Sequence, residues 1–280
     1  MHASTIEMQS PRFLPAEIPP MVKQSRSRIR QMSSKKIQWI RVHRIAPDTI
    51  AKVHLDAHEA ITEAINLSML RGMTTIPVPQ VRQVVVNSSS NTYIIMEYVD
   101  GETLASCWHR LSLLSKLQIA WTLRGYVGQL RRLRRSVPGT LDGAACTGLL
   151  FTDYGAGPFT SYDEMTAWFN HKLDVSQRMK HAPPDAPRFD NSWPLVFTHQ
   201  DLCPRNIMLA RDGKVYMVDW EGSGFYPSWF EYVGMRSDVH FKSRLWDILI
   251  PWISHSVCTR KRIDEYWRNI VWAVKVGVAM

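Results

Sequence analysis

The sequence has few cysteines, and their positions exclude two common kinds of stabilising site. The four cysteines are far apart and form no Cys-x-x-Cys pair: Cys107, Cys146, Cys203 and Cys258. Scattered thiols of this kind match neither a structural zinc site nor a disulfide-linked scaffold. They are typical of a protein in a reducing compartment.

Long apolar runs are also missing. No run reaches the roughly 18 residues that a membrane-spanning helix requires. Residues 1–30 contain prolines and scattered charges where a signal peptide would have an apolar core. We therefore expect a cytoplasmic protein without a transmembrane segment.

Apolar and aromatic residues, by contrast, are plentiful. Of the 280 residues 45% are hydrophobic, and 11 are tryptophan. This composition favours a globular protein over a disordered one. The length allows either one large domain or two lobes.

The net charge of +9 is distributed unevenly. Residues 1–48 contain nine Lys/Arg against three Asp/Glu, and so carry +6 of the total. We interpret residues 1–30 as a basic flexible tail, which is either simply solvated or able to touch nucleic acid or acidic membrane. A second basic cluster, Arg131 to Arg135, ends a helical pattern, where cations suit the helix dipole. Because neither cluster is interleaved with aromatic residues, we expect no specific nucleic-acid partner.

Local patterns predict strands and one helix before residue 99, and mostly helices after it. We expect strands over Ile37–Ile45, Thr49–Val53, Val81–Val86 and Tyr93–Tyr98, and a helix over His54–Arg71. The longest helical pattern is Leu111–Leu133, with five apolar positions at Leu117, Trp121, Leu123, Val127 and Leu130. After Pro227 we expect two or three more helices, with their aromatic residues in the core.

The most informative segment is residues 195–221, where short apolar runs flank three polar residues. The runs are Leu195–Phe197, Ile207–Leu209 and Val215–Val218, and the polar residues are Asp201, Asn206 and Asp219. Short apolar runs bounded by turn signals predict buried strands. The pair Asp212-Gly213 predicts a hairpin between the last two strands. The hairpin would bring the loop with Asp201 and Asn206 beside Asp219.

Three converging oxygen-bearing side chains suit phosphoryl transfer. This reaction needs a carboxylate that orients the attacking hydroxyl and accepts its proton, and hard oxygen ligands for Mg²⁺ on the phosphates. The spacing His199-x-Asp201-x-x-x-x-Asn206 is that of a kinase catalytic loop, in which the Asp is the base and the Asn a metal ligand. Ordinary turn residues would explain a lone His-x-Asp, but they explain less well two motifs in order and joined by a hairpin.

With Asp219-Trp220-Glu221 and the segment Gly224 to Pro227, this stretch resembles the aminoglycoside phosphotransferase and choline kinase-like family, and its fungal-type phosphotransferase members in particular. The resemblance covers about residues 36–275. It implies an α+β, two-lobe protein-kinase-like fold with a nucleotide cleft between the lobes. Residues 31–99 would form a small β-rich N-lobe with one helix, and residues 100–280 a larger, mainly helical C-lobe.

The resemblance also implies an activity and a set of roles. The protein would be an ATP-dependent kinase that moves the γ-phosphoryl group to a hydroxyl of a small molecule. Asp201 would be the base, and Asn206 and Asp219 would hold Mg²⁺. His199 would brace the loop, whereas Glu221 would either assist near the metal or serve as a structural carboxylate.

The nucleotide-binding residues are expected in the N-lobe. Ile50-Ala51-Lys52 resembles the kinase strand whose lysine binds the α- and β-phosphates and pairs with a helix glutamate. Glu63 is the expected partner, with Glu59 one turn earlier as the alternative. Otherwise, Lys52 would be a surface lysine at a strand edge.

The segment Met96-Glu97-Tyr98-Val99 resembles the kinase hinge. In that resemblance Met96 is the gatekeeper, and the backbone from Glu97 to Val99 faces the adenine. Because backbone groups would make the contact, the side chains specify it weakly.

One departure from the kinase pattern concerns glycine, which does not occur before Gly72. A protein kinase uses a Gly-rich loop there, so that backbone N–H groups can approach the phosphates. Ser33-Ser34-Lys35-Lys36 takes that place here. The missing glycines leave a non-catalytic kinase-like binding protein, a pseudokinase, as the alternative. A protein kinase is disfavoured because no Ala-Pro-Glu motif follows Asp219.

The acceptor and the oligomeric state are not specified by the sequence. Residues 225–280 contain eight Lys/Arg against five Asp/Glu. They therefore do not form an evidently acidic wall for a polycationic aminoglycoside.

Overall fold

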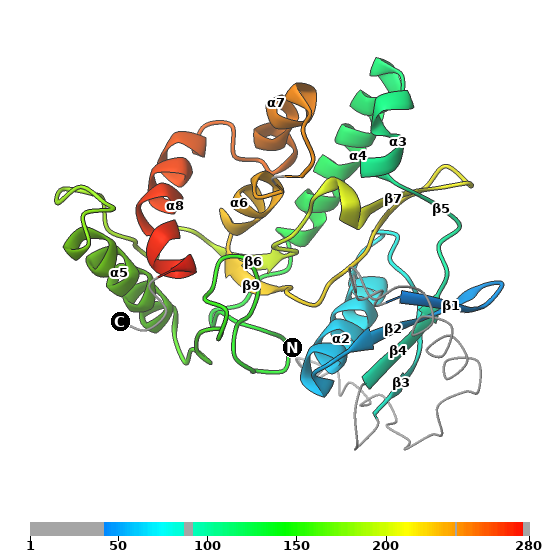
Figure 1. Ribbon diagram of the computed structural model, residues 1–280, viewed down its shortest axis with the longest axis horizontal. Coiled ribbons are helices and arrows are strands. Elements are labelled where there is room, and N and C mark those ends of the chain that lie inside the picture. Colours follow the sequence, from blue (N-terminus) through cyan, green and yellow to red (C-terminus); the bar gives the residue numbers. More distant parts are fainter. Residues whose placement is uncertain (1–41, 87–91, 239, 277–280) are drawn as a thin grey trace, which may run out of the picture. The chain divides into compact units, whose positions relative to one another are not determined.

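The computed structural model describes residues 42–86, 92–238 and 240–276 (Figure 1). This part of the chain divides into two compact units, one with residues 42–64 and 79–98, the other with residues 65–78 and 99–276. The expected basic tail (1–30), the segment Ser33–Lys36 and most of the first expected strand lie outside the described residues.

The first unit is built on a four-stranded antiparallel sheet with the strand order β1-β2-β4-β3. Its strands are β1 (Val42–Ala46), β2 (Thr49–His54), β3 (Val81–Val85) and β4 (Thr92–Glu97). Ala51 of β2 packs with Val85, Tyr93 and Ile95 in the core of this unit. β2 lies between two strands, so hydrogen bonds pair both of its edges, and its residues are buried or half-buried.

The helix α2 (Ala57–Met73) begins in the first unit and ends in the second. It starts three residues later than the sequence predicts, because His54 still belongs to β2, where it pairs with Thr92. Glu63 lies near the middle of α2 and is almost completely buried.

The second unit is mainly helical. Its α-helices are α3 (Leu104–Cys107), α4 (Leu113–Leu130), α5 (Tyr162–Arg178), α6 (Phe230–Arg236), α7 (Arg244–Ile253) and α8 (Arg260–Lys275). Serine caps start three of them, at Ser112, Ser161 and Ser243, where the side chain accepts an N–H of the first turn. The three helices after Pro227 agree with the prediction.

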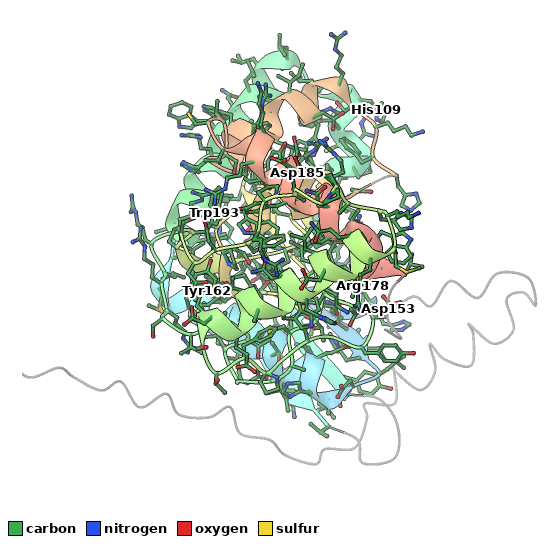
Figure 2. The ribbon with its side chains drawn as sticks, turned by 90° about the vertical axis from the view of Figure 1, so that its left-hand side faces the viewer. His109, Asp153, Tyr162, Arg178, Asp185 and Trp193 are labelled. Carbon is green, nitrogen blue, oxygen red and sulfur yellow. The ribbon has the colours of Figure 1, made fainter. Side chains whose placement is uncertain are left out.

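Helices α4 and α5 pack against different helices. Helix α4 packs against α7, and α5 packs against α8. Figure 2 shows α5 from Tyr162 to Arg178, with Trp193 beside its first turn. The Tyr162 hydroxyl donates a hydrogen bond to the carbonyl oxygen of Trp193 at 2.9 Å. Further along α5, Phe169 packs against the rings of Trp229 and Phe230, so these two aromatic residues after Pro227 enter the core, whereas Trp252, Trp267 and Trp272 are half-buried.

Five short strands of the second unit position the polar loop of interest. One sheet contains β5 (Gly101–Thr103), β7 (Ile207–Ala210) and β8 (Val215–Met217), and another pairs β6 (Leu195–Thr198) with β9 (Gly224–Pro227). The predicted hairpin is confirmed: β7 and β8 are antiparallel, and Gly213 in their turn has a positive φ of 84°. Among the described residues, no helix combines the length and the apolar character that crossing a membrane requires.

Candidate functional site

The loop of residues 199–206 carries the predicted base and is held at both ends. Before it, β6 pairs with β9, with Thr198 opposite Gly224. After it, the 3₁₀ turn η2 (Pro204–Asn206) leads directly into β7. Within it, the N–H of Cys203 donates to the carbonyl of Asp201 at 2.9 Å. The loop therefore has a defined backbone path between two sheets.

His199 is completely buried and braces this loop from inside. Its Nε2 lies 3.0 Å from the carbonyl oxygen of Val218, and its Nδ1 lies 3.4 Å from the N–H of Asp201. Burial lowers the pKa of His199, so the ring is neutral at neutral pH. A neutral ring that donates from Nε2 accepts at Nδ1, and one tautomer therefore satisfies both contacts.

Glu231 of α6 holds the same loop from the other side, and the sequence reasoning missed it. Its carboxylate accepts the backbone N–H of His199 at 2.8 Å, and its side chain is buried. Burial raises the pKa of Glu231 to about 7, although this N–H and the charge of Arg131 both act to lower it. The only sequence signal was a glutamate at an otherwise apolar position of a terminal helix.

Asp201 and Asn206 are joined directly. The Nδ2 of Asn206 donates to both the carbonyl oxygen and the Oδ2 of Asp201, at 2.9 Å each. An asparagine that donates through Nδ2 presents Oδ1 as its ligand atom. The N–H of Val218 donates to the carbonyl of Asn206 at 3.0 Å, which places the next residue, Asp219, beside this pair. The structure thus brings all three predicted residues of the second unit to one loop cluster.

Two residues of this cluster have backbone angles in the left-handed region. Asp219 has a φ of 70° and Gln200 a φ of 68°. Aspartate tolerates this conformation better than most residues, whereas glutamine has no such advantage. The side chain of Gln200 donates to the carbonyl of Gly222 at 2.6 Å, which helps to hold the strained position.

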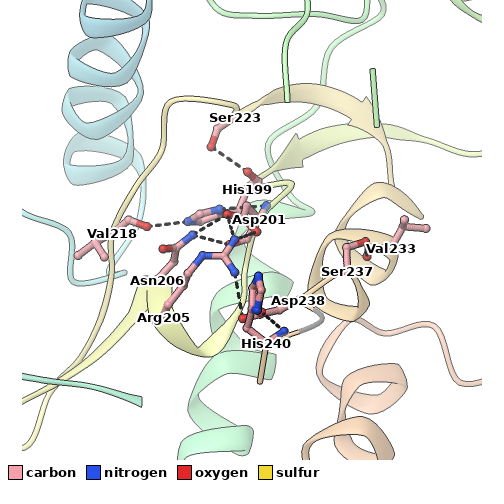
Figure 3. A network of polar contacts seen from close by, with 10 residues as sticks. All are labelled: His199, Asp201, Arg205, Asn206, Val218, Ser223, Val233, Ser237, Asp238 and His240. Atoms are coloured by element: carbon pink, nitrogen blue, oxygen red, sulfur yellow. Dashed lines mark hydrogen bonds and ion pairs between the residues drawn. The ribbon is translucent and has the colours of Figure 1, made fainter. Parts of the chain in front are cut away.

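Arg205 and Asp238 complete the surroundings of Asp201 (Figure 3). The Nη2 of Arg205 lies 2.8 Å and 2.6 Å from the two carboxylate oxygens of Asp201. Its Nη1 lies 3.0 Å from Asp238, whose side chain is only 5% exposed. One guanidinium therefore spans two carboxylates. The four-residue spacing between Asp201 and Arg205 was visible in the sequence, but nothing there pointed to Asp238.

A pocket of about 540 Å³ opens beside Arg205, within the second unit. Its lining residues are Ala105, Arg205, Ser237, Asp238, His240 and Phe241. Figure 3 shows His240 next to Arg205 and Asp238. Since Arg205 contacts Asp201, the pocket lies next to the predicted base.

In the first unit, Lys52 is paired within the interior. Its Nζ lies 3.0 Å and 2.8 Å from the two carboxylate oxygens of Glu63, and it is 8% exposed. Lys52 is in β2, which lies between β1 and β4, so the interpretation as a surface lysine at a strand edge is wrong. The structure pairs Lys52 with Glu63, whereas the carboxylate of Glu59 lies 3.8 Å from Nδ1 of His54.

His54 is a second cation on Glu63 that the sequence reasoning missed. Its Nε2 lies 2.9 Å from the Glu63 carboxylate, and its side chain is fully buried. Burial lowers the pKa of His54, but the hydrogen bonds with Glu59 and Glu63 outweigh it and raise the pKa to about 9. Burial would raise the pKa of Glu63, but Lys52 and His54 together lower it. His54 and Glu63 are therefore both charged at neutral pH.

The expected hinge residues lie at the end of β4 and just beyond it. Met96 and Val99 are buried. The N–H of Glu97 donates to the carbonyl of Gln80 at 2.9 Å. An adenine contact here would use other backbone groups of the segment, and it stays a prediction.

One protein-family model matches most of the chain. Residues 41–248 match the model described as the phosphotransferase enzyme family. The chain belongs to the phosphotransferase enzyme family. A comparison with curated proteins finds no match.

The solved structures that resemble this phosphotransferase include aminoglycoside-modifying enzymes. The GDP complex of wild-type aminoglycoside 2'-phosphotransferase-IIIa has 15% identity and a TM-score of 0.55, over 91% of this chain and 88% of that chain. The gentamicin complex of APH(2")-IIa has 12% identity and a TM-score of 0.52, over 92% and 89%. At these identities the likeness shows the fold. The predicted α+β kinase-like fold is thereby confirmed.

The residues of this phosphotransferase suit Mg²⁺ as a ligand set. Magnesium in phosphate-binding sites is held by one or two carboxylates together with phosphate oxygens and water. Asn206 and Asp219 offer hard oxygen atoms from two adjacent segments, and the set contains no thiol or imidazole that would favour a softer metal.

Proposed function

We propose that this phosphotransferase moves the γ-phosphoryl group of ATP to a hydroxyl of a small molecule. The observation that supports it most is the environment of Asp201. Its carboxylate is held by Arg205 and Asn206, and Arg205 in turn lines a pocket large enough for a small substrate. A positioned carboxylate beside an open pocket is what a hydroxyl acceptor needs in this reaction.

In the proposed reaction Asp201 orients the acceptor hydroxyl and accepts its proton. The hydroxyl oxygen forms a bond to the γ-phosphorus, the bond from that phosphorus to the β–γ bridging oxygen breaks, and ADP leaves. Asn206 and Asp219 would hold Mg²⁺, which neutralises charge on the phosphate oxygens. Lys52, oriented by Glu63, would bind the α- and β-phosphates.

The charge of the pocket bears on the acceptor class. The two carboxylates nearest to it, Asp201 and Asp238, share the guanidinium of Arg205. Phe241 adds an apolar wall and His240 a polar one. This lining lacks the excess of negative charge that would attract a polycation. We therefore infer a hydroxyl compound of low charge.

The proposal is tested by comparing the wild type with Asp201→Asn on a panel of hydroxyl compounds, with ATP and Mg²⁺. The substitution keeps the size but removes the proton acceptor, so turnover should fall by about 10²–10⁴-fold. Affinity for ATP should change little. The matched control is Asp212→Asn in the β7–β8 turn, whose carboxylate is paired with Lys214 on the surface. Equal turnover by Asp201→Asn and wild type would refute the role of Asp201.

A pseudokinase is the second candidate, because no glycine precedes Gly72. Experiments on the same purified protein distinguish a pseudokinase from an active kinase. Calorimetry with ATP, with and without Mg²⁺, measures nucleotide binding independently of transfer. Tight binding without transfer to any compound of the panel would favour the pseudokinase. Loss of the Mg²⁺ dependence in Asp219→Asn would support the metal site in either case.

A further inference from the structure

The first half of α4 exposes a row of large apolar side chains. Their exposed fractions are 61% for Leu113, 67% for Leu114, 43% for Leu117 and 71% for Trp121. The buried face of the same helix is formed by other residues: Ile119, Ala120, Leu123, Val127 and Leu130. The exposed leucines and the tryptophan are thus additional to the core of the unit.

These side chains share one face of the helix and continue onto a neighbour. Leu114, Leu117 and Trp121 follow one another at spacings of three and four, which places them above one another on the helix. Helix α7 packs alongside α4 (Figure 1) and adds Ile248, which is 63% exposed. The ring of Trp252 in α7 lies 5.6 Å from that of Trp121 and connects the two helices.

We call this surface the α4–α7 face, formed by Leu113, Leu114, Leu117, Trp121 and Ile248. Single exposed apolar residues are common on soluble proteins and need no explanation. A contiguous group from two helices marks an interaction surface instead. The question is then which partner fits it.

The charged residues of the segment that contains α4 have one sign. Residues 103–141 contain seven Lys/Arg and no Asp/Glu. On α4 itself these are Lys116 and Arg124, and Arg132, Arg134 and Arg135 are exposed just after its end. Arg132 lies in the turn just after α4, where its N–H donates to the carbonyl of Gln129 at 3.0 Å.

The start of helix α7 is also rich in basic residues. Arg244 and Lys242 are exposed there, and Asp247 is the acidic residue of the helix. Arg131 belongs to the basic cluster but serves the fold, because its Nη2 donates to the carbonyls of Ser228 and Ser254. Of the exposed arginines beyond it, Arg135 lies over the ring of the buried Phe225, at 4.8 Å from the ring centroid.

We propose that the α4–α7 face docks on the surface of an anionic lipid membrane. An apolar row with a tryptophan, bordered by basic residues, is the pattern of a helix that lies in the membrane interface. Each Lys or Arg near an anionic bilayer adds about 1 kcal/mol of attraction. The basic residues 1–48, with their +6 charge, would act in the same direction.

Other occupants fit the same observations less well. A second copy of the chain would bring two basic borders together, which costs free energy. Nucleic acid would match the charge, but bases stack on aromatic rings, and four of the five residues of the face are aliphatic.

The test is cosedimentation of the full chain with vesicles. The vesicles are phosphatidylcholine alone, or phosphatidylcholine with about one third phosphatidylserine, in low and in high salt. We expect binding to the phosphatidylserine vesicles only, weakened by salt. The double variant Leu117→Glu/Trp121→Glu should reduce the binding at least about tenfold, because it places two charges in the apolar row. Both residues are exposed, so the variant should fold, which thermal unfolding verifies.

Matched variants separate the face from its surroundings. Tyr154→Glu, at another exposed aromatic residue of the same unit (86% exposed), should bind like the wild type. Arg132→Glu/Arg134→Glu should weaken binding to phosphatidylserine vesicles and reduce its dependence on salt.

Three results would overturn the proposal. The first is equal vesicle binding by the Leu117→Glu/Trp121→Glu variant and the wild type. The second is complete loss of binding on deletion of residues 1–30 alone, which would assign the membrane contact to that segment. The third is absence of vesicle binding together with self-association or nucleic-acid binding that the double variant abolishes, which would give the face to one of those partners.

Discussion

Gly234 of α6 lies directly against Gln200 of the 199–206 loop. A Cβ atom on Gly234 would stand 2.6 Å from the carbonyl carbon of Gln200 and 3.2 Å from its Cα, and closer still to the carbonyl oxygen. Helix α6 and the loop can therefore approach this closely only with glycine at position 234. The close approach also allows Glu231, one turn earlier on α6, to reach the N–H of His199.

We expect Gly234→Ala to separate α6 from the loop, because the obstructing atoms belong to the backbone and cannot rotate away. The free energy of unfolding should fall by about 1–3 kcal/mol, and phosphoryl transfer should fall with it. Denaturant unfolding gives the first quantity. Gly125→Ala in α4 is the control: a Cβ there meets nothing within 4 Å, and alanine should stabilise that helix by about 0.5–1 kcal/mol. If Gly234→Ala left the free energy of unfolding unchanged, the close approach of α6 to the 199–206 loop would not require glycine.

A second prediction concerns the pH dependence of stability and Glu231. Burial raises its pKa from the ordinary value of 4.5 to about 7 in the folded protein. Between these values the folded state binds more protons than the unfolded state, so this group lowers stability as the pH rises, by up to about 1.4 kcal/mol per pH unit. Glu231→Gln cannot titrate and can still accept the His199 N–H.

Relative to wild type, Glu231→Gln should therefore become more stable from pH 5 to pH 8. Chemical denaturation of both proteins across this range measures the difference. Glu265→Gln, at an exposed position of α8, provides the control for removing a carboxylate. A difference between Glu231→Gln and wild type that stays constant with pH would show that Glu231 does not titrate in this range.

A third prediction concerns His54, whose raised pKa also makes stability fall as the pH rises. Burial lowers its pKa, and so does Lys52, but Glu59 and Glu63 outweigh both and raise the pKa from the ordinary value of 6.5 to about 9. The stability that this raised pKa contributes is fully present below pH 6.5 and is lost as the pH rises through 9. It amounts to about 3 kcal/mol.

His54→Gln should thus be most destabilising at pH 6 and much less so at pH 9.5. Denaturant unfolding at the two pH values measures this. His58→Gln, at an exposed histidine of α2, is the control. The same loss of stability at both pH values would mean that His54 acts by packing and not by charge.

The fourth prediction concerns Asp238, which we expect to position the base through Arg205. Asp238→Asn keeps the shape but removes the charge that holds Nη1 of Arg205 at 3.0 Å. The guanidinium should then hold Asp201 less well, and turnover should fall about tenfold to a hundredfold. The KM for ATP should be unchanged, because Asp238 is not placed at the nucleotide.

Steady-state kinetics with the best acceptor of the panel, or with water as acceptor, separate kcat from KM. Asp238→Glu should restore part of the activity, since it restores the charge. If Asp238→Asn has normal turnover, the pair with Arg205 has no role in positioning Asp201.

Local sequence was enough to place the elements that carry the site. The Asp-Gly turn, the apolar runs around it and the spacing of the kinase-like motif predicted the hairpin and the cluster of Asp201, Asn206 and Asp219. These features depend on residues close together in the chain, whose geometry is set by turn chemistry and by the alternation of strands. The family could be identified from the same residues.

Contacts between distant segments were decided only by the tertiary structure. The support of the loop by Glu231, the pair between Arg205 and Asp238, and the place of His54 beside Glu63 join residues from different elements. A local pattern carries no information on which helix packs on which loop. The sequence favoured Glu63 over Glu59 as the partner of Lys52, and the structure shows the two side chains in contact.

Helix α4 shows that local sequence also cannot predict which apolar residues are buried. Its apolar period predicted a helix over Leu111–Leu133, and the structure has it over Leu113–Leu130. The period includes both Leu123, which is buried, and Trp121, which is 71% exposed. Hydrophobicity determines that these residues avoid water when they can, but only the packing of the other helices determines which of them are covered. For this reason the sequence predicts the helix, and the tertiary structure alone reveals the face that it leaves open.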